Sequence, residues 1–105
     1  MSTLTEQYID AVNEADIEGL IALFAPTATL SQRDRAYVGI DQIAAFYQEL
    51  WLPGPSAHVV EKQFADGNAH IVQFKATGPT GEIRHAVDVF IIANTLIESL
   101  EIYYR

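Results

Sequence analysis

Apolar residues recur at helical spacing at the start of the chain. Leu4, Tyr8 and Val12 follow one another at intervals of four residues, so they lie on one face of a helix. Thr3 and Glu6 have the spacing of a capping box, in which each side chain bonds the other residue's backbone N–H. The pattern therefore predicts a first helix that begins at Thr3 and buries the side of the chain that carries Tyr8.

Two further helices are predicted in the first half of the chain. Asp16 is a good N-cap for a second helix, and Pro26 lies just past the expected end of that helix. Residues 39–50 have apolar side chains at helical spacing, which predicts a third helix. The proline- and glycine-containing residues 53–55 end it, because proline cannot continue a helix.

Strands are predicted mainly in the second half of the chain. Residues 27–31 have the pattern of one short strand, and the polar residues 32–38 after it are expected to form a loop. Turn signals such as residues 66–68 then separate four longer stretches that are rich in apolar side chains. These stretches predict strands over residues 57–65, 69–77, 82–92 and 96–104.

The predicted order of two helices, a strand, a helix and four strands is typical of an α+β domain. A length of 105 residues favours one domain over residues 1–105. The sheet has one face to cover, and three helices are available to cover it. If the long strands curl, the helices close a cone around an internal hollow, which is the usual place for a small ligand.

The charge balance excludes several classes of partner. Fourteen acidic and six basic residues give a formal net charge of −8, which argues against binding to nucleic acid or to an anionic membrane. No apolar run approaches the length of a transmembrane helix. Residues 1–7 contain no basic residue and no apolar run, so we expect no signal peptide. The chain has no cysteine, which fits a reducing compartment, and we expect a soluble, cytoplasmic protein.

No motif in the sequence has the spacing of a metal or cofactor site. The three histidines, His58, His70 and His85, are 12 and 15 residues apart, and no close pair has a metal-ligand pattern. The sequence also lacks a glycine-rich phosphate loop and a serine nucleophile motif. We therefore expect no metal and no cofactor. His85 and Asp88 are expected on opposite faces of one strand unless a bulge intervenes.

Six short motifs resemble bacterial ketosteroid isomerases. The opening of those enzymes is similar to YIDAV at residues 8–12, ADIEGL at 15–20, LFA at 23–25 and ATL at 28–30. Their third helix is similar to GIDQIAAFY at 39–47, and the strand with their buried acid is similar to AVDVF at 86–90. The resemblance extends from about residue 5 to residue 105. It places the chain among ketosteroid-isomerase-like and SnoaL-like proteins of the nuclear-transport-factor-two-like superfamily.

This resemblance implies a fold and a set of site residues. The fold is a cystatin-like α+β barrel, in which a curved mixed sheet wraps around three N-terminal helices and encloses a pocket. Ketosteroid isomerases use an aspartate base, with a tyrosine and a protonated aspartic acid that stabilise an oxyanion. The resemblance assigns the oxyanion tyrosine to Tyr8, the protonated acid to Asp88, and a tyrosine that hydrogen-bonds Tyr8 to Tyr47. Phe24 replaces a supporting tyrosine, and Gln32 stands where the base is expected.

The glutamine at position 32 departs from the family pattern. A glutamine amide cannot accept and return a proton near neutral pH. Asp34 is two residues further on and points the same way if the segment stays extended, so it is a candidate for a displaced base. Its neighbours Arg33 and Arg35 would keep it ionised and weaken it as a base. The alternative for this segment is a solvated, charge-balanced loop.

The two principal site residues each have a structural alternative. Asp88 has apolar neighbours and is expected to be buried, with a raised pKa and a protonated carboxyl group that faces the pocket. Alternatively, it caps backbone N–H groups or pairs with Arg84. Tyr8 lines the pocket, or it is a core tyrosine whose hydroxyl group bonds a backbone carbonyl. The other residues that we expect at the ligand are Val12, Phe24, Gln32, Tyr47, Trp51, Phe90 and Tyr104.

Two functions of different classes follow from these residues. The first is a protein that binds, or acts on, a small hydrophobic carbonyl or phenol compound, with Tyr8 and Asp88 donating to an enolate-like oxygen. If it is an enzyme, it is similar to an isomerase or cyclase. The second is a non-catalytic ligand-binding or dimerisation module. An epoxide hydrolase on the same fold is a weaker third, because Arg84 and Asp88 are four residues apart rather than tightly spaced.

A homodimer is also expected. The last two predicted strands carry apolar residues on both faces, and a face that does not fill the cone would be exposed in a monomer. These residues are Phe90, Ile92, Leu100, Ile102, Tyr103 and Tyr104. The family resemblance likewise implies a two-fold dimer formed through the sheet.

The residue at position 32 leads to a first prediction. The protein is expected to isomerise Δ5-3-ketosteroids very slowly, because a general base typically contributes ~10²–10⁴-fold to such a rate. Replacing Gln32 with Asp is expected to raise any trace of activity. The ultraviolet absorbance of the conjugated product measures both rates, and rapid turnover by the unmodified protein would show that another residue is the base.

Overall fold

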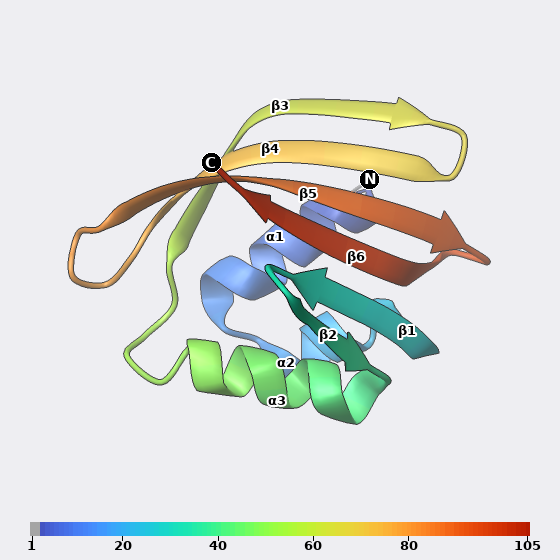
Figure 1. Cartoon of the computed structure of the whole chain (residues 1–105), viewed down its shortest axis with the longest axis horizontal. Helices are drawn as coiled ribbons and strands as arrows, with labels where there is room; N and C mark the ends of the chain where they lie inside the picture. Colours follow the sequence, from blue (N-terminus) through green and yellow to red (C-terminus); the bar gives the residue numbers. More distant parts are fainter. Residues whose placement is uncertain (1–2) are drawn as a thin grey trace.

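The computed structural model describes residues 3–105, so the first two residues of the segment considered for a signal peptide lie outside it. The described part contains three helices and six strands (Figure 1). In chain order these are α1 (Leu4–Glu14), α2 (Ile17–Ile21), β1 (Phe24–Gln32), β2 (Arg35–Val38), α3 (Ile40–Leu50), β3 (Ala57–Asp66), β4 (Ala69–Thr77), β5 (Ile83–Ala93) and β6 (Leu96–Tyr104).

The helix starts agree with the local sequence signals. The Thr3 hydroxyl accepts a hydrogen bond from the Glu6 backbone at 3.1 Å, and the Glu6 carboxylate accepts one from the Thr3 backbone at 3.2 Å, which confirms the capping box. Asp16 accepts from the backbone of Gly19 at 3.0 Å and caps α2. Helix α3 follows Gly39, whose φ of 85° lies in the left-handed region that favours glycine.

The segment from residue 32 to residue 38 differs from the predicted loop. Residues 35–38 form β2, which pairs antiparallel with β1, and β1 itself begins at Phe24 rather than at residue 27. Arg33 has a φ of 55°, so the chain reverses tightly over Arg33 and Asp34. Strand β2 lies at the edge of the sheet and is mostly exposed. Its polar composition is ordinary for an edge strand, and the same composition is typical of a loop, so composition alone does not separate the two.

The six strands form one curved sheet in the order β2-β1-β6-β5-β4-β3. The β1–β6 pair is parallel and the other neighbours are antiparallel, so the sheet is mixed, as predicted. Figure 1 shows the three helices on one side of it. Side chains on that inner face of the sheet are buried, including Leu30, Val72, Phe74, Phe90 and Leu100. The predicted α+β class with three covering helices is confirmed.

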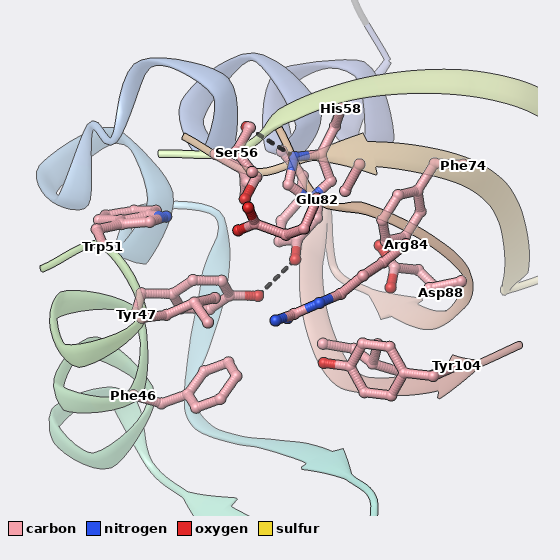
Figure 2. A pocket seen from close by; sticks show the side chains of 17 residues that line it. Phe46, Tyr47, Trp51, Ser56, His58, Phe74, Glu82, Arg84, Asp88 and Tyr104 are labelled. Atoms are coloured by element: carbon pink, nitrogen blue, oxygen red, sulfur yellow. Dashed lines mark hydrogen bonds between the residues drawn. The ribbon is translucent and has the colours of Figure 1, made fainter. Parts of the chain in front are cut away.

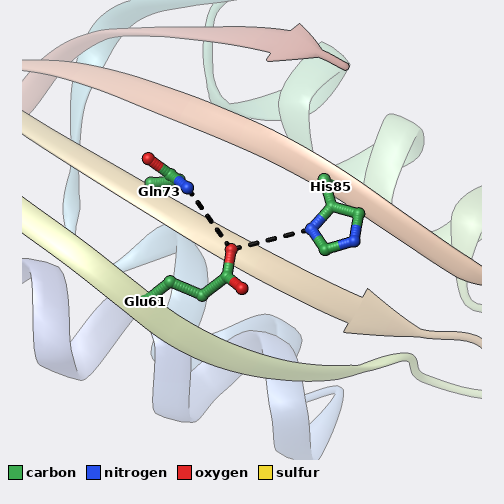
Figure 3. A network of polar contacts seen from close by, with 3 residues as sticks. All are labelled: Glu61, Gln73 and His85. Carbon is green, nitrogen blue, oxygen red and sulfur yellow. Dashed lines mark hydrogen bonds and ion pairs between the residues drawn. The ribbon is translucent and has the colours of Figure 1, made fainter.

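The outer face of the sheet has no helix over it (Figure 1). His85 lies on this face and Asp88 on the inner one, in agreement with their parity on β5. The His85 ring nitrogen is 3.6 Å from the Glu61 carboxylate, and Gln73 donates to the same carboxylate oxygen at 3.5 Å (Figure 3). Within residues 3–105, no helix is long and apolar enough to cross a lipid bilayer.

Candidate functional site

A cavity lies between α1, α3 and the inner face of β4, β5 and β6 (Figure 2). The space open to the centres of water molecules inside it is about 70 Å³. Its walls are mainly apolar and aromatic, with Val12 from α1, Phe46 and Trp51 at α3, and Phe74 from β4. Polar groups are added by Tyr47 from α3, His58 from β3, and Arg84 and Asp88 from β5.

Asp88 is the most unusual polar group of this cavity. It lies on the inner face of β5 between the buried residues Ala86 and Phe90, and 1% of its surface is exposed. Neither of its carboxyl oxygens has a hydrogen-bond partner among residues 3–105. Burial raises the pKa of this carboxyl group well above its ordinary value of 3.8. Burial therefore favours the neutral form of the group, which has one O–H donor and one carbonyl acceptor.

Tyr8 and Tyr47 form a buried pair at the same cavity. Their hydroxyl groups are hydrogen-bonded to each other (Figure 2), and the two side chains come from α1 and α3. Burial is the largest cause that raises the pKa of each phenol well above 10.0. Both hydroxyl groups keep their protons, and only one of these is used in the bond between them. The other O–H remains available as a donor to a third group.

Most of the residues predicted at the ligand line this cavity. Tyr8, Asp88, Val12, Tyr47, Trp51 and Tyr104 do so. Phe24 and Phe90 are buried but do not line it. Their rings instead contact the Tyr8 ring, with centroid distances of 6.4 Å and 5.1 Å. Both rings pack against the Tyr8 ring, and neither of them contacts the cavity.

Gln32 and Asp34 lie outside the cavity. Asp34 is exposed in the turn between β1 and β2, beside Arg33. Gln32 lines a separate, shallower hollow together with Arg33 and Tyr104. The Arg33 guanidinium lies 4.6 Å from the centroid of the Tyr104 ring. Ile102 and Tyr104 line both hollows, so the two hollows adjoin at these side chains.

Arg84 and His58 line the cavity, although the sequence did not single them out as ligand contacts. Arg84 and Asp88 are four residues apart on β5, so their side chains share a face, and this could be predicted from the sequence. The face on which the His58 side chain lies could not be predicted from spacing in the same way. Counted back from the β3–β4 hairpin, His58 has the parity of the outward-facing Phe64, but a register shift between Val60 and Lys62 turns it inward.

The backbone of His58 is fixed to α1 by a side-chain amide. Asn13 accepts from the His58 N–H at 2.6 Å and donates to the His58 carbonyl at 3.1 Å. The His58 ring packs on Phe74 at a centroid distance of 4.8 Å. Burial lowers the pKa of this imidazole from 6.5. His58 is therefore a neutral imidazole at the wall of the cavity, and Asn13 fixes its backbone.

The described residues contain no group of three histidine, aspartate or glutamate side chains that could hold a metal ion. The acidic and imidazole groups at the cavity are Asp88, His58 and the exposed Glu82. The polar groups at the cavity can donate and accept hydrogen bonds.

The comparison with protein families shows to which family the chain belongs. The sequence profile of the SnoaL-like domain matches residues 5–99. The chain belongs to the SnoaL-like family. No curated protein matches this SnoaL-like domain in sequence.

Solved structures share the fold of this SnoaL-like domain. A candidate ketosteroid isomerase from Kribbella flavida has a TM-score of 0.87 at 22% identity, covering 97% of this chain and 75% of that one. A candidate polyketide cyclase from Sinorhizobium meliloti has a TM-score of 0.84 at 24% identity, with 97% and 94% covered. A protein with a ketosteroid isomerase-like fold from Catenulispora acidiphila, in complex with trimethylamine, has a TM-score of 0.86 at 16% identity, with 98% and 87% covered. The family resemblance of the sequence is confirmed, and these similarities establish the fold.

Proposed function

We propose that this SnoaL-like protein binds, or acts on, a small hydrophobic carbonyl or phenol compound through Tyr8 and Asp88. The observation that carries the proposal is the buried Asp88 carboxyl group, whose two oxygens have no partner and which lines the same cavity as Tyr8. A buried polar group without a partner costs about 1–3 kcal/mol. A ligand oxygen that accepts from Asp88 recovers this free energy.

The protonation states favour an oxygen that carries negative charge. Tyr8, Tyr47 and Asp88 all keep their protons near neutral pH, because burial opposes ionisation of each group. Donors held in an apolar site stabilise an enolate or phenolate oxygen more strongly than they stabilise a neutral carbonyl oxygen. If the protein is an enzyme, this arrangement fits isomerase- or cyclase-like chemistry that passes through an enolate.

The size of the cavity favours a small ligand. An apolar cavity of roughly 150 Å³ holds a benzene molecule, and the enclosed space here is about 70 Å³. A ligand the size of a phenol therefore extends to the mouth, where Glu82 and Arg84 are exposed. A steroid needs much more space, which agrees with the slow steroid isomerisation expected from the sequence.

Substitutions of Asp88 test the oxyanion site. We expect the protein to bind 2-cyano-4-nitrophenolate at least about tenfold more tightly than 3-nitrobenzonitrile, which lacks the oxygen. Asp88→Asn keeps a donor and is expected to lose little of this preference. Asp88→Leu removes the donor and is expected to weaken the phenolate while sparing the nitrile. Absorbance titrations measure the affinities.

Thermal melts of the same three proteins supply the control. If Asp88 serves only the fold, both substitutions change the melting temperature and leave the preference between the two ligands as it was. That result would contradict the oxyanion site and favour the non-catalytic module.

A small organic cation is the second candidate ligand. The Catenulispora neighbour contains trimethylamine, and the cavity here combines an unpartnered acid with the aromatic rings of Phe46, Tyr47 and Trp51. Such rings attract an ammonium group through their faces. Arg84 at the mouth opposes this alternative, because it adds a positive charge to the same cavity.

The pH dependence of binding separates the two ligands. Trimethylammonium needs an ionised Asp88, so its affinity would rise as the pH rises through the raised pKa of that group. The phenolate needs a protonated Asp88, so its affinity falls over the same range. Calorimetric titrations at several pH values are expected to show the second behaviour. An affinity for trimethylamine that increases with pH would replace the proposal with a passive cation-binding function.

We also propose a homodimer that forms through the outer face of the sheet. Large apolar side chains of this face are well exposed in the single chain, among them Val59 at 57%, Phe64 at 63% and Tyr103 at 55%. Exposed apolar surface of this kind usually marks an interface. Of the residues first considered for this role, Phe90, Leu100 and Ile102 are buried, so they fill the core instead.

Light scattering tests the assembly. We expect the mass of a dimer at micromolar concentration and the mass of a monomer for Phe64→Glu, because a charge there opposes burial of the face. Leu52→Glu is the matched control, since Leu52 is 82% exposed in the connection between α3 and β3 and lies off the sheet. A monomer mass for the unmodified protein would exclude the dimer.

The cytoplasm is the location that we propose for the protein. The support is compositional, because the chain has no cysteine and its fold does not depend on an oxidising compartment.

A further inference from the structure

The cavity has donors for a developing oxyanion, but the groups considered so far include no base. Burial favours the protonated forms of Tyr8, Tyr47 and Asp88. Gln32 and Asp34 lie outside the cavity. A proton that leaves a ligand carbon must therefore go to another group in the cavity wall. His58 is a neutral imidazole among the lining residues and has not yet been given a role.

The hydrogen bonds of His58 define its tautomer. Its Nδ1 atom is 3.1 Å from the backbone carbonyl oxygen of Ser56 (Figure 2). A carbonyl oxygen only accepts hydrogen bonds, so Nδ1 carries the proton and donates it to Ser56. The other ring nitrogen, Nε2, then carries a free lone pair. A neutral imidazole with an unprotonated Nε2 is a general base that is ready at neutral pH.

Local structure holds this base in place. The register shift between Val60 and Lys62 turns the His58 side chain to the inner face of the sheet. The two hydrogen bonds from Asn13 anchor the His58 backbone to α1, which is the helix that also carries Tyr8. One helix thus fixes both the proposed oxyanion donor and the imidazole.

We propose that His58 is the general base of this cavity, taking a proton through Nε2 from a ligand carbon next to a carbonyl group whose oxygen is bound by Tyr8 and Asp88. The assignment rests on the proposed function, because it uses the same ligand oxygen.

The proton transfer balances without a co-reactant. The C–H bond breaks, and its electron pair forms a C=C bond to the carbonyl carbon. The carbonyl π pair moves to the oxygen, which becomes an enolate held by the two donors. When the ligand also has a C=C bond next to the carbon that loses the proton, the imidazolium returns the proton to the far carbon of that bond, and the double bond moves into conjugation with the carbonyl group. The product is an isomer of the starting ketone, and His58 is neutral again.

The charged groups around the cavity act on this base in opposite directions. Arg84 disfavours the imidazolium, and Glu82 favours it, but both lie exposed at the mouth, where solvent weakens their effect. For the other titratable groups from α1, α3, β5 and β6 that line the cavity, burial favours the uncharged form; these are Tyr8, Tyr47, Asp88 and Tyr104. Burial is the largest cause of the lowered His58 pKa.

The ring opening of 5-nitro-1,2-benzisoxazole tests the base directly. A base removes the proton from carbon 3, the N–O bond breaks, and 2-cyano-4-nitrophenolate forms as a coloured product. The unmodified protein is expected to accelerate this reaction, and His58→Gln is expected to lower the rate by ~10²-fold or more. His70→Gln is the matched control, because His70 lines a different hollow, and it is expected to keep the rate.

The pH profile gives a readout that a structural role would not move. The rate of the unmodified protein is expected to rise with pH through one ionisation below 6.5, and His58→Gln is expected to lose this ionisation. His58→Gln is also expected to keep its affinity for 2-cyano-4-nitrophenolate, which shows that the variant is folded and that the oxyanion donors are intact.

The outcomes separate this inference from the proposed function. If the unmodified protein binds the phenolate but does not accelerate ring opening, or if His58→Gln keeps the full rate, His58 is not the base and the proposed function stands. If the phenolate does not bind the unmodified protein at all, the shared oxyanion site is wrong and both proposals are overturned.

Discussion

The buried carboxyl group of Asp88 is the constraint around which the cavity is organised. Ionisation of a carboxyl group is costly on the inner face of β5, because the neighbouring residues are apolar and no hydrogen-bond donor among residues 3–105 compensates the charge. Burial therefore favours the neutral form of the group. A purely structural core would place an apolar side chain at this position, so the cost of Asp88 has to be offset by the rest of the fold.

Helix α1 connects the parts of the site to one another. Its Tyr8 side chain bonds Tyr47 on α3, and its Asn13 side chain bonds the backbone of His58 on β3. The capping box at Thr3 and Glu6 fixes where this helix begins. Because both contacts come from one rigid helix, donors from α1 and α3 and an imidazole from β3 keep a constant arrangement around the cavity.

The two faces of the sheet have separate roles. The inner face packs on three helices and supplies Phe74, Asp88 and Tyr104 to the cavity. The outer face carries exposed apolar side chains together with the contact between Glu61 and His85 (Figure 3). Successive side chains along β5 point to opposite faces of the sheet, so this strand contributes residues to both faces. The side chains of the two faces can therefore differ in character along the same strand.

Local patterns in the sequence determined the helices, the long strands and the family. The capping box, the apolar spacing of α1 and α3, and the hairpin signal before β4 each depend on neighbouring residues, so they could be interpreted without a structure. Tyr8, Tyr47 and Asp88 were found in the same way, because they occur within short motifs that resemble a known family.

Only the tertiary structure decided the features that depend on distant contacts. Strand β2 exists because β1 is beside it, and its polar residues alone look like a loop. The face of β5 on which Arg84 lies could be predicted from its spacing to Asp88, but the sequence did not show that this side chain reaches the mouth of the cavity. His58 faces inward because of a register shift in β3, and such a shift reverses the parity on which sequence-based assignment relies. Gln32 and Asp34 were assigned by alignment and by spacing, whereas their true positions depend on a tight turn and on the ring of Tyr104. Periodicity is a property of neighbouring residues, and the lining of a cavity is set by strand pairing and by packing between residues that are far apart in the chain.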